Sequence, residues 1–521
     1  MKHHVRRKAL ALFLTAMTLF TASCSASQPA ATDKSSAEPS SQESSEVKES
    51  SAEQESSAEQ ESSAEQESSS PRRNSLSQNA SAKELTESYD SFAQAHDAFT
   101  TTLTREENSD SLPQEPPEGF DLVSYPSKVG DLAAYVSSDP GDGEKHPLVI
   151  WVVGGWGYGI SANPWSYPEW SNDQTGSAFW QAGILTMYPS FRGANGNPGH
   201  FEALFGEIDD IASAYEYAAS LPYVDPDRIY LAGHSTGGTR ALLASEYTDK
   251  FRAVFCFGAV DEIKYHNNTQ FTFDTDNEAE FAMRSPIHWL DDVKSPTFLI
   301  EGRDGNSANL ERMEQATRNE NIHCYVIENA DHFSTLAPLT RLAAQKILAD
   351  TGAEPSIAIT QEELDAAMTQ EPQIPAPVMT SQSIDWLGLT LSCPYVWMVD
   401  DSDDKETALY SIYEDDNTWD MSLLYLSGFT LQGGGSLQDL KGQLTGQGFE
   451  VADASVGGLP ALDCLTMLED DNGSVFYERY CVVQNGEVFV TLDFLIHESY
   501  MDEAVPLFQS ILDSVTFEPA E

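Results

Sequence analysis

The chain has 521 residues, and 83 Asp and Glu against 28 Lys and Arg give it a formal net charge of −55. Binding of nucleic acid through its phosphates needs clustered Lys and Arg, and no such cluster follows the basic start of the chain, so the composition excludes a nucleic-acid partner. Six cysteines without a C-x-x-C pair, and histidines without zinc-ligand spacing, predict no metal site, and we expect no other cofactor.

Residues 1–24 have the organisation of a secretory signal. A basic start is followed by an apolar run, residues 9–20, that is too short to span a bilayer as a stable helix. The next four residues, TASC, resemble the lipobox of bacterial lipoproteins, although Thr21 stands where Leu is usual. This resemblance implies that Cys24 is lipidated and anchors the protein to the outer side of the cell membrane; ordinary secretion is the alternative.

Residues 25–81 consist mainly of Ser, Glu, Gln and Ala, and include three tandem copies of SSAEQE between residues 50 and 67. Such a segment buries too little apolar surface to offset the entropy lost on ordering. We therefore expect a disordered tether between the anchor and a globular body.

Two globular regions are predicted after the tether, residues 82–368 and 381–521, separated by a proline-rich linker at 369–380. In the first region, apolar strand-like runs alternate with helical patterns, which is typical of a doubly wound α/β fold with a mostly parallel sheet. The predicted strands are 147–154, 182–188, 229–232, 253–257, 297–301 and 323–327, with a hairpin over 121–136 and helices over 81–102 and 205–221.

The most informative motif is Gly-His-Ser-Thr-Gly at residues 233–237. It follows an apolar run and precedes a helix-favouring run, residues 239–247, so it reads as a strand, a sharp turn and a helix with Ser235 at the apex. Glycines on both sides of the serine permit the tight turn, which is the pattern of the nucleophile elbow in α/β-hydrolases.

Three segments together resemble the catalytic domain of the prolyl oligopeptidase family. They are YPSFRGANG at 188–196, LPYVDPDRIYLAGHSTGG at 221–238, and Ser-Pro-Ile at 285–287 followed by the strand at 297–301. The resemblance covers about residues 120–350 and implies an α/β-hydrolase fold and serine hydrolysis of peptides, with esterases as close relatives. The β-propeller usual in that family does not fit before the hydrolase, and the insert at 261–284 is a candidate lid.

The base and acid partners of Ser235 are expected after it in the chain. His332 follows a strand and matches the position of the catalytic histidine in the family. Asp304, just after the strand at 297–301, is the first candidate for the acid, although its loop is one residue shorter than the family pattern. Asp261, after the strand at 253–257, is the runner-up.

The oxyanion hole needs two backbone donors. One is the N–H of Thr236, and the other is expected from Gly155 or Trp156 in the loop after the strand at 147–154. Arg192 is expected to form a salt bridge with the acidic residues of the helix at 205–221, namely Glu207, Asp209 and Asp210, and not to take part in catalysis.

The region 381–521 reads as an α+β domain with an antiparallel sheet. Its arrangement is loosely similar to PsbP-like domains, and it has no catalytic constellation, so we expect a binding or positioning role with a cell-envelope component as candidate ligand. Cys464 and Cys481 lie on neighbouring strand-like runs and are a candidate disulfide pair. The predicted strands are 386–394, 407–413, 421–425, 461–468, 475–483 and 488–496, with helices at 436–447 and 502–515.

These features together predict a cell-surface serine hydrolase. It would cleave a peptide or ester bond in a small molecule or short peptide, through a triad of Ser235, Asp304 and His332 and an acyl-enzyme intermediate. Two alternatives stay open: a carboxylesterase or acyl-sugar esterase, and a catalytically inactive hydrolase fold kept as a binding lipoprotein.

Overall fold

The computed structural model describes most of the chain from residue 80 onward. The predicted signal, Cys24 and nearly all of the predicted tether lie outside the described residues, as does the middle of the predicted linker. None of the helices in the described part is both long enough and apolar enough to cross a bilayer. The described residues are 80–156, 159–161, 163–165, 172–266, 270–370, 377–403, 406–410, 413–414, 419–420, 423–431, 435–469, 475–498 and 501–518.

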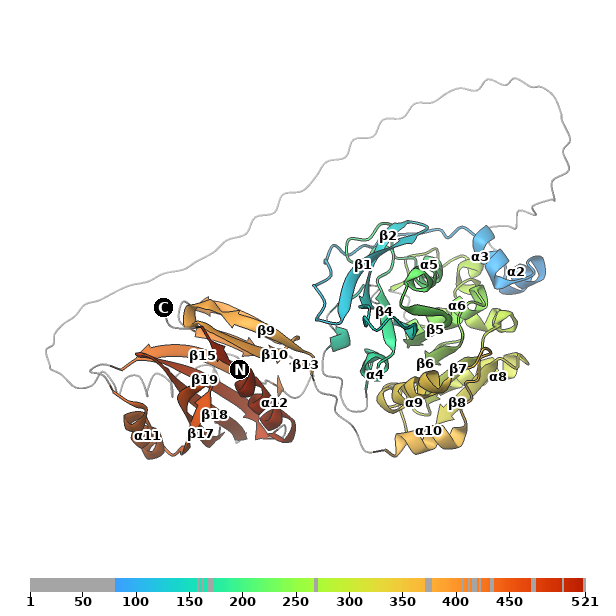
Figure 1. The fold of residues 1–521 in the computed structure, drawn as a ribbon. Helices are drawn as coiled ribbons and strands as arrows, with labels where there is room; N and C mark the ends of the chain where they lie inside the picture. Colours follow the sequence, from blue (N-terminus) through green and yellow to red (C-terminus); the bar gives the residue numbers. More distant parts are fainter. Residues whose placement is uncertain are drawn as a thin grey trace, which may run out of the picture. The chain divides into compact units, whose positions relative to one another are not determined.

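An eight-stranded sheet forms the centre of the first region, with the order β1-β2-β4-β3-β5-β6-β7-β8 (Figure 1). Strands β4, β3, β5, β6, β7 and β8 run parallel, while β1 and β2 form an antiparallel hairpin at one edge. This order confirms the predicted α/β-hydrolase fold and its edge hairpin. The strands are β1 (Phe120–Ser127), β2 (Gly130–Ser137), β3 (His146–Val152), β4 (Leu185–Pro189), β5 (Val224–His234), β6 (Val254–Phe257), β7 (Thr297–Gly302) and β8 (Ile322–Ile327).

Helices cover both faces of this sheet. Helices α3, α5, α6 and α8 contribute to one apolar cluster, and α4, α9 and α10 contribute to the other. The central strand β5 shows why its run 229–232 is apolar: Ile229 and Leu231 pack in the first cluster, and Tyr230 and Ala232 pack in the second. The helices are α2 (Ala82–Ser88), α3 (Phe92–Ala98), α4 (Ser177–Gln181), α5 (Gly206–Ser220), α6 (Thr236–Tyr247), α7 (Glu278–Ala282), α8 (Ser307–Ala316), α9 (Leu336–Ala349) and α10 (Gln361–Met368).

The single helix predicted over residues 81–102 is instead two short helices, α2 and α3. The chain turns to extended backbone at Tyr89, which ends α2. Ser91 then begins α3, because its side chain accepts a hydrogen bond from the backbone N–H of Gln94. A serine that can cap a new helix competes with continuation of the old one.

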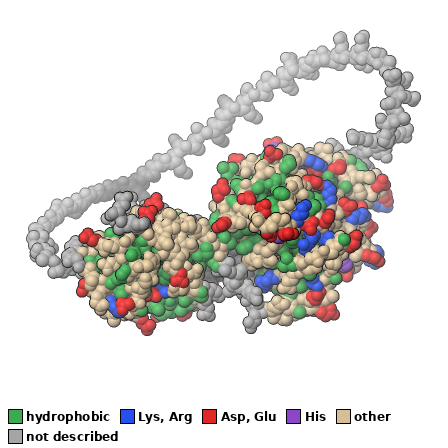
Figure 2. Space-filling view, viewed as in Figure 1, with side chains coloured by type: hydrophobic (Ala, Val, Ile, Leu, Met, Phe, Trp, Pro, Cys, Tyr) green, Lys and Arg blue, Asp and Glu red, His purple; other side chains and the backbone are tan. Residues whose placement is uncertain are grey.

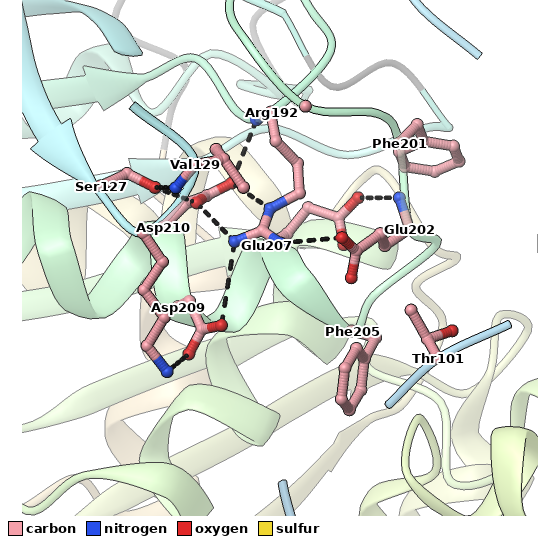
Figure 3. A network of polar contacts seen from close by, with 12 residues as sticks. Thr101, Ser127, Val129, Arg192, Phe201, Glu202, Phe205, Glu207, Asp209 and Asp210 are labelled. Carbon is pink, nitrogen blue, oxygen red and sulfur yellow. Dashed lines mark hydrogen bonds and ion pairs between the residues drawn. The ribbon is translucent and has the colours of Figure 1, made fainter. Parts of the chain in front are cut away.

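A buried ionic network holds the loop after β4 against α5 (Figure 3). The Arg192 guanidinium donates to both carboxylate oxygens of Asp210 at 3.0 and 2.9 Å, and to Glu202 at 2.9 Å. Asp209 lies 3.8 Å away, whereas Glu207 accepts from the backbone N–H of Glu202 instead. The predicted salt bridge between Arg192 and this helix is therefore present, and it runs mainly through Asp210.

Replacing Arg192 with methionine is expected to destabilise the protein by about 3–5 kcal/mol, because Asp210 is fully buried and loses its cation. Equilibrium urea denaturation of the full chain measures this cost. Arg303→Met is the control, since Arg303 is exposed and its pairs with Glu311 and Glu328 lie in solvent, where ion pairs contribute little. Equal midpoints for the two variants would contradict the structural role of Arg192.

The C-terminal region forms a separate antiparallel sheet of seven strands, in the order β11-β12-β15-β19-β18-β17-β16, as predicted for an α+β domain. Helix α12 packs in the apolar cluster on one face, and α11 in the cluster on the other. Short strands β20, β10 and β9 form a further sheet. The elements are β9 (Met379–Ile384), β10 (Leu389–Pro394), β11 (Met398–Asp403), β12 (Glu406–Tyr410), β13 (Tyr413–Glu414), β14 (Trp419–Asp420), β15 (Leu423–Thr430), α11 (Leu437–Gly446), β16 (Glu450–Val456), β17 (Leu459–Glu469), β18 (Val475–Asn485), β19 (Val488–His497), α12 (Met501–Ser514) and β20 (Thr516–Phe517).

Cys464 and Cys481 are not a disulfide in this structure, although they do lie on the neighbouring strands β17 and β18. In the strand register Cys464 faces Tyr480, and Cys481 faces Asp463. Side chains alternate between the two faces of a sheet, so a shift of one residue places the two thiols on opposite sides. Cys481 accordingly packs in the cluster with α12, and Cys464 in the cluster with α11.

Acidic side chains are scattered over both parts of the described chain on the face shown in Figure 2, with basic ones lying among them. An acidic surface of this kind favours solubility through mutual repulsion between molecules.

Candidate active site

The carboxyl ends of the parallel strands meet at one edge of the sheet, and the candidate catalytic residues follow them there. Gly154 lies just after β3, Ser235 directly after β5, and Gly258 directly after β6. Glu301 is the second-to-last residue of β7, and the loop carrying His332 follows β8. This edge is where open α/β sheets place their ligands.

Ser235 has the backbone conformation of a nucleophile elbow. Its φ of 57° and ψ of −121° lie in a region that a non-glycine residue adopts only under strain. Neighbouring contacts hold it there: the Ser235 N–H donates to the carbonyl of Phe257 at 2.7 Å, and the Ser235 carbonyl accepts from Thr239 N–H at 2.9 Å. The elbow glycines Gly233 and Gly237 have no room for a side chain, because a Cβ on either would overlap with backbone atoms.

His332 is held by a carboxylate that the sequence analysis did not select. Its Nδ1–H donates to Oε2 of Glu301 at 2.8 Å. Glu301 is fully buried, and its other oxygen accepts the backbone N–H of Gly302 at 2.7 Å. The acid of the pair is therefore ordered by two hydrogen bonds, and the imidazole keeps Nε2 available for another partner.

Two glycines make room for this pair. A Cβ on Gly258 would overlap with Cε1 of His332, and a Cβ on Gly305 would lie 2.5 Å from Oε1 of Glu301 and 2.9 Å from the backbone nitrogen of His332. Gly258 also follows Phe257, whose carbonyl accepts from Ser235. The serine turn and the histidine ring thus both lie against the segment of Phe257 and Gly258.

Neither aspartate selected from the sequence lies against His332. Asp304 is exposed in a tight turn closed by a hydrogen bond from Gly305 N–H to the Gly302 carbonyl. Asp261 is buried but forms an ion pair with Arg312 and accepts the N–H of Glu262. The structure brings Ser235, His332 and Glu301 to one site, and the carboxylate bonded to His332 is that of Glu301 and not that of Asp304 or Asp261.

Glu301 lies three residues before Asp304, inside β7, and its carboxylate accepts from His332. A signal was present in the sequence: Glu301 is the one charged residue in the strand TFLIEG, and a carboxylate in a buried strand is nearly always paired.

The candidate oxyanion donors lie beside the elbow. Thr236 is the first residue of α6, where a backbone N–H has no partner within its helix. Its hydroxyl donates to the carbonyl of Gly155, which ties the loop after β3 to the elbow. Gly155 has a φ of 77°, and the next residue, Trp156, packs edge to face on Phe271 at 5.6 Å between ring centroids.

The aromatic residues near this loop serve mainly as packing. Trp151 and Trp165 are buried in the core, while Tyr158 and Trp170 lie outside the described residues. The described part of the insert at 261–284 is anchored to the hydrolase, because Phe271 and Phe273 are buried and the Thr272 hydroxyl donates to the carbonyl of Phe201. These contacts hold the described part of the insert against the hydrolase fold.

One group among the described residues has the composition of a metal site: His96, Asp97 and Asp209. The ammonium of Lys128 lies 2.7 Å from Asp209 and 3.3 Å from Asp97, so these carboxylates already share a cation. Burial lowers the pKa of His96, and its Nε2 bonds to the Phe205 carbonyl. Nothing in this group requires a metal.

Comparison with known proteins finds one family model that matches part of the chain. The model of the prolyl oligopeptidase family, Peptidase_S9, matches residues 170–335, a segment that contains Ser235, Glu301 and His332. Residues 170–335 are therefore similar to the prolyl oligopeptidase family domain. A search of curated proteins finds no match.

Solved structures similar to this chain include both peptidases and esterases. A puromycin-hydrolyzing peptidase of Mycobacterium tuberculosis is 19% identical, with 46% of this chain and 40% of that chain covered and a TM-score of 0.39. Dipeptidyl peptidase 4 of Porphyromonas gingivalis is 17% identical, with 44% and 35% covered and a TM-score of 0.36. An esterase of Pyrobaculum calidifontis is 16% identical, with 45% and 86% covered and a TM-score of 0.34. The chain thus spans less than half the length of the first two.

Proposed function

We propose that this protein is a serine hydrolase that cleaves a peptide or ester bond through an acyl-enzyme intermediate, with Ser235, His332 and Glu301 as its triad. The observation that carries the proposal is the 2.8 Å hydrogen bond from His332 to the buried Glu301, next to a serine in a strained elbow. The match of residues 170–335 to a peptidase family supports it.

The proposed reaction proceeds in two halves. Nε2 of His332 takes the proton of the Ser235 hydroxyl while the oxygen attacks the acyl carbonyl, and the imidazolium then gives that proton to the leaving amine or alcohol. In the second half, Nε2 of His332 takes a proton from water while the water oxygen attacks the carbonyl of the acyl-enzyme. The imidazolium then returns that proton to the Ser235 oxygen as the ester bond breaks, and the carboxylic acid product leaves. Glu301 keeps the proton on Nδ1 and stabilises the positive charge that develops on the ring.

The developing oxyanion is proposed to bind two backbone donors. The N–H of Thr236 is one, since it lies at the start of α6, where the helix dipole also favours negative charge. The second is the N–H of Gly155 or Trp156, whose loop is joined to the elbow through the Thr236 hydroxyl.

Fluorophosphonate labelling of the full chain tests the proposal, because this reagent reacts with an activated serine. We expect one adduct, located on Ser235 by peptide mass spectrometry. Panels of short aminoacyl and peptidyl anilides and of short acyl esters then distinguish a peptidase from an esterase. A folded protein that is neither labelled nor active on any panel would favour the inactive binding module.

We also propose that the protein is lipid-anchored at Cys24 on the outside of the cell membrane. The support is the signal-like composition of residues 1–24 and the lipobox-like sequence that ends at Cys24. When the full chain is expressed in a bacterial host fed radiolabelled palmitate, Cys24→Ser is expected to lose the label and to leave the membrane fraction. Equal incorporation by the wild type and the variant would exclude this anchor.

The C-terminal domain is proposed to bind or position a cell-envelope component. Its helices and sheet form two apolar clusters of their own, which is consistent with an accessory domain. The similarity to PsbP-like domains stays a prediction from the sequence pattern.

A further inference from the structure

His234, the residue before the nucleophile, contacts the loop that carries the catalytic histidine. It is the last residue of β5 and only 1% exposed. Its Nε2 lies 3.1 Å from the backbone carbonyl oxygen of His332, and the two imidazole rings are 4.6 Å apart between centroids. A carbonyl oxygen can only accept, so Nε2 of His234 carries the proton and donates it to this bond.

The imidazole of His234 is neutral, and its second nitrogen, Nδ1, carries no proton. Burial, with a smaller contribution from the neighbouring His332, lowers the pKa of His234 to about 3. The ring is therefore neutral at every pH where a histidine base is active, and Nδ1 is a bare acceptor with no partner among the described residues. A neutral ring at this distance adds no repulsion when His332 becomes positive.

The loop that His234 contacts is held by local bonds and by bonds to β7 and the turn after it, from His332 to Glu301 and from Asp304 N–H to the Ala330 carbonyl. The carboxylate of Asp331 accepts the N–H groups of Phe333 and Ser334 at 2.9 and 2.8 Å, which makes a tight turn around His332. Asn329, at the start of the turn, has a φ of 60°. The bond from His234 joins this turn to the elbow strand.

Gly154 allows His234 to take this position. A Cβ on Gly154 would lie 2.8 Å from the His234 carbonyl, 3.1 Å from its Nδ1 and 3.2 Å from Cβ of Ser235. The His234 ring thus lies where the loop after β3, the elbow and the His332 turn meet. These are the parts that supply the proposed oxyanion donor, nucleophile and base.

We propose that His234 is a positioning residue for catalysis: by donating Nε2–H to the carbonyl of His332, it fixes the backbone of the base relative to the nucleophile. Glu301 orients the ring of His332 through Nδ1, and His234 fixes the backbone from which that ring projects. This inference rests on the proposed hydrolase function, because it assigns a role within that same site.

Two substitutions separate the hydrogen bond from the packing. His234→Phe keeps the ring and its volume but removes the donor, whereas His234→Gln removes the ring and keeps an N–H donor near the position of Nε2. The measurement is the rate of fluorophosphonate labelling of the full chain, resolved into the maximal rate and the half-saturating concentration. We expect the Phe variant to lose about tenfold in maximal rate with unchanged half-saturation, and Gln to restore most of it.

His96 provides the matched control. It is also a buried histidine whose pKa is lowered by burial and whose Nε2 bonds to a backbone carbonyl, that of Phe205, but it lies on α3. His96→Phe is expected to lower the melting temperature as His234→Phe does and to leave the labelling rate unchanged. The melting temperatures of all variants are measured in parallel.

The outcomes are distinguishable from failure of the proposed function. If the wild type is not labelled, the hydrolase proposal fails. If the wild type is labelled and His234→Phe reacts at the same rate, the positioning role fails while the hydrolase stands. If His234→Phe keeps the wild-type labelling rate and His234→Gln loses it, the ring of His234 serves only to fill space, and the proposal is overturned.

Discussion

Ser235→Ala is expected to abolish fluorophosphonate labelling and to lower the maximal rate of hydrolysis by about 10⁶-fold, because members of a triad act as a unit and loss of the nucleophile removes the covalent route. Folding should be preserved. The strained backbone of Ser235 is held by bonds from its own N–H and carbonyl, and the substitution leaves both intact.

Ser245→Ala is the matched control for this variant. Ser245 is a buried serine on the same helix, α6, and its hydroxyl donates to the carbonyl of Leu242 at 2.7 Å. The Ser245→Ala variant should be labelled by the fluorophosphonate to the same extent as the wild type. Labelling that persists in Ser235→Ala would place the nucleophile elsewhere, and the adduct would then have to be mapped anew.

Glu301→Gln is expected to lower the maximal rate about 10⁴-fold with little change in the Michaelis constant. The amide keeps the shape of the side chain but carries no charge, so it stabilises neither the required tautomer of His332 nor its positive form. Steady-state hydrolysis of whichever ester or anilide proves to be a substrate gives the two constants, and the labelling rate gives an independent measure.

Asp304→Asn distinguishes the two assignments of the acid. Asp304 is exposed, so its substitution should change the rate less than about twofold. Asp261→Asn removes the negative charge that pairs with Arg312, and we expect it to lower the stability of the protein more than its activity. A large loss in Asp304→Asn, together with a nearly normal Glu301→Gln, would return the role to the aspartate and would require a rearranged turn after β7.

Much of the fold was predictable because its signals are local. Continuous apolar runs predicted the parallel strands, since a strand buried on both faces cannot alternate, and a helical pattern predicted α5. The glycines around Ser235 predicted the elbow for the same reason: the backbone there takes a conformation with no space for side chains. The division of residues 81–102 into two helices depended on one capping serine, which competes closely with continuation of the helix.

The candidate site was predictable only in part. Ser235 and His332 stand at strand ends, and the order of the chain alone places them at one edge of the sheet. The carboxylate that bonds to His332 depends on tertiary contacts. It belongs to Glu301 inside β7, whereas the sequence pattern favoured an aspartate after that strand.

The sequence by itself determined the fold class and selected Ser235 and His332 as the proposed nucleophile and base, because each follows from short-range patterns of apolar, glycine and strand-end residues. Only the tertiary structure decided that Glu301 faces His332, that His234 bonds to the backbone of that histidine, and that Cys464 and Cys481 point to opposite faces. These relations join residues that are distant in the chain. They depend on strand register and on the paths of the loops, which local sequence patterns do not predict.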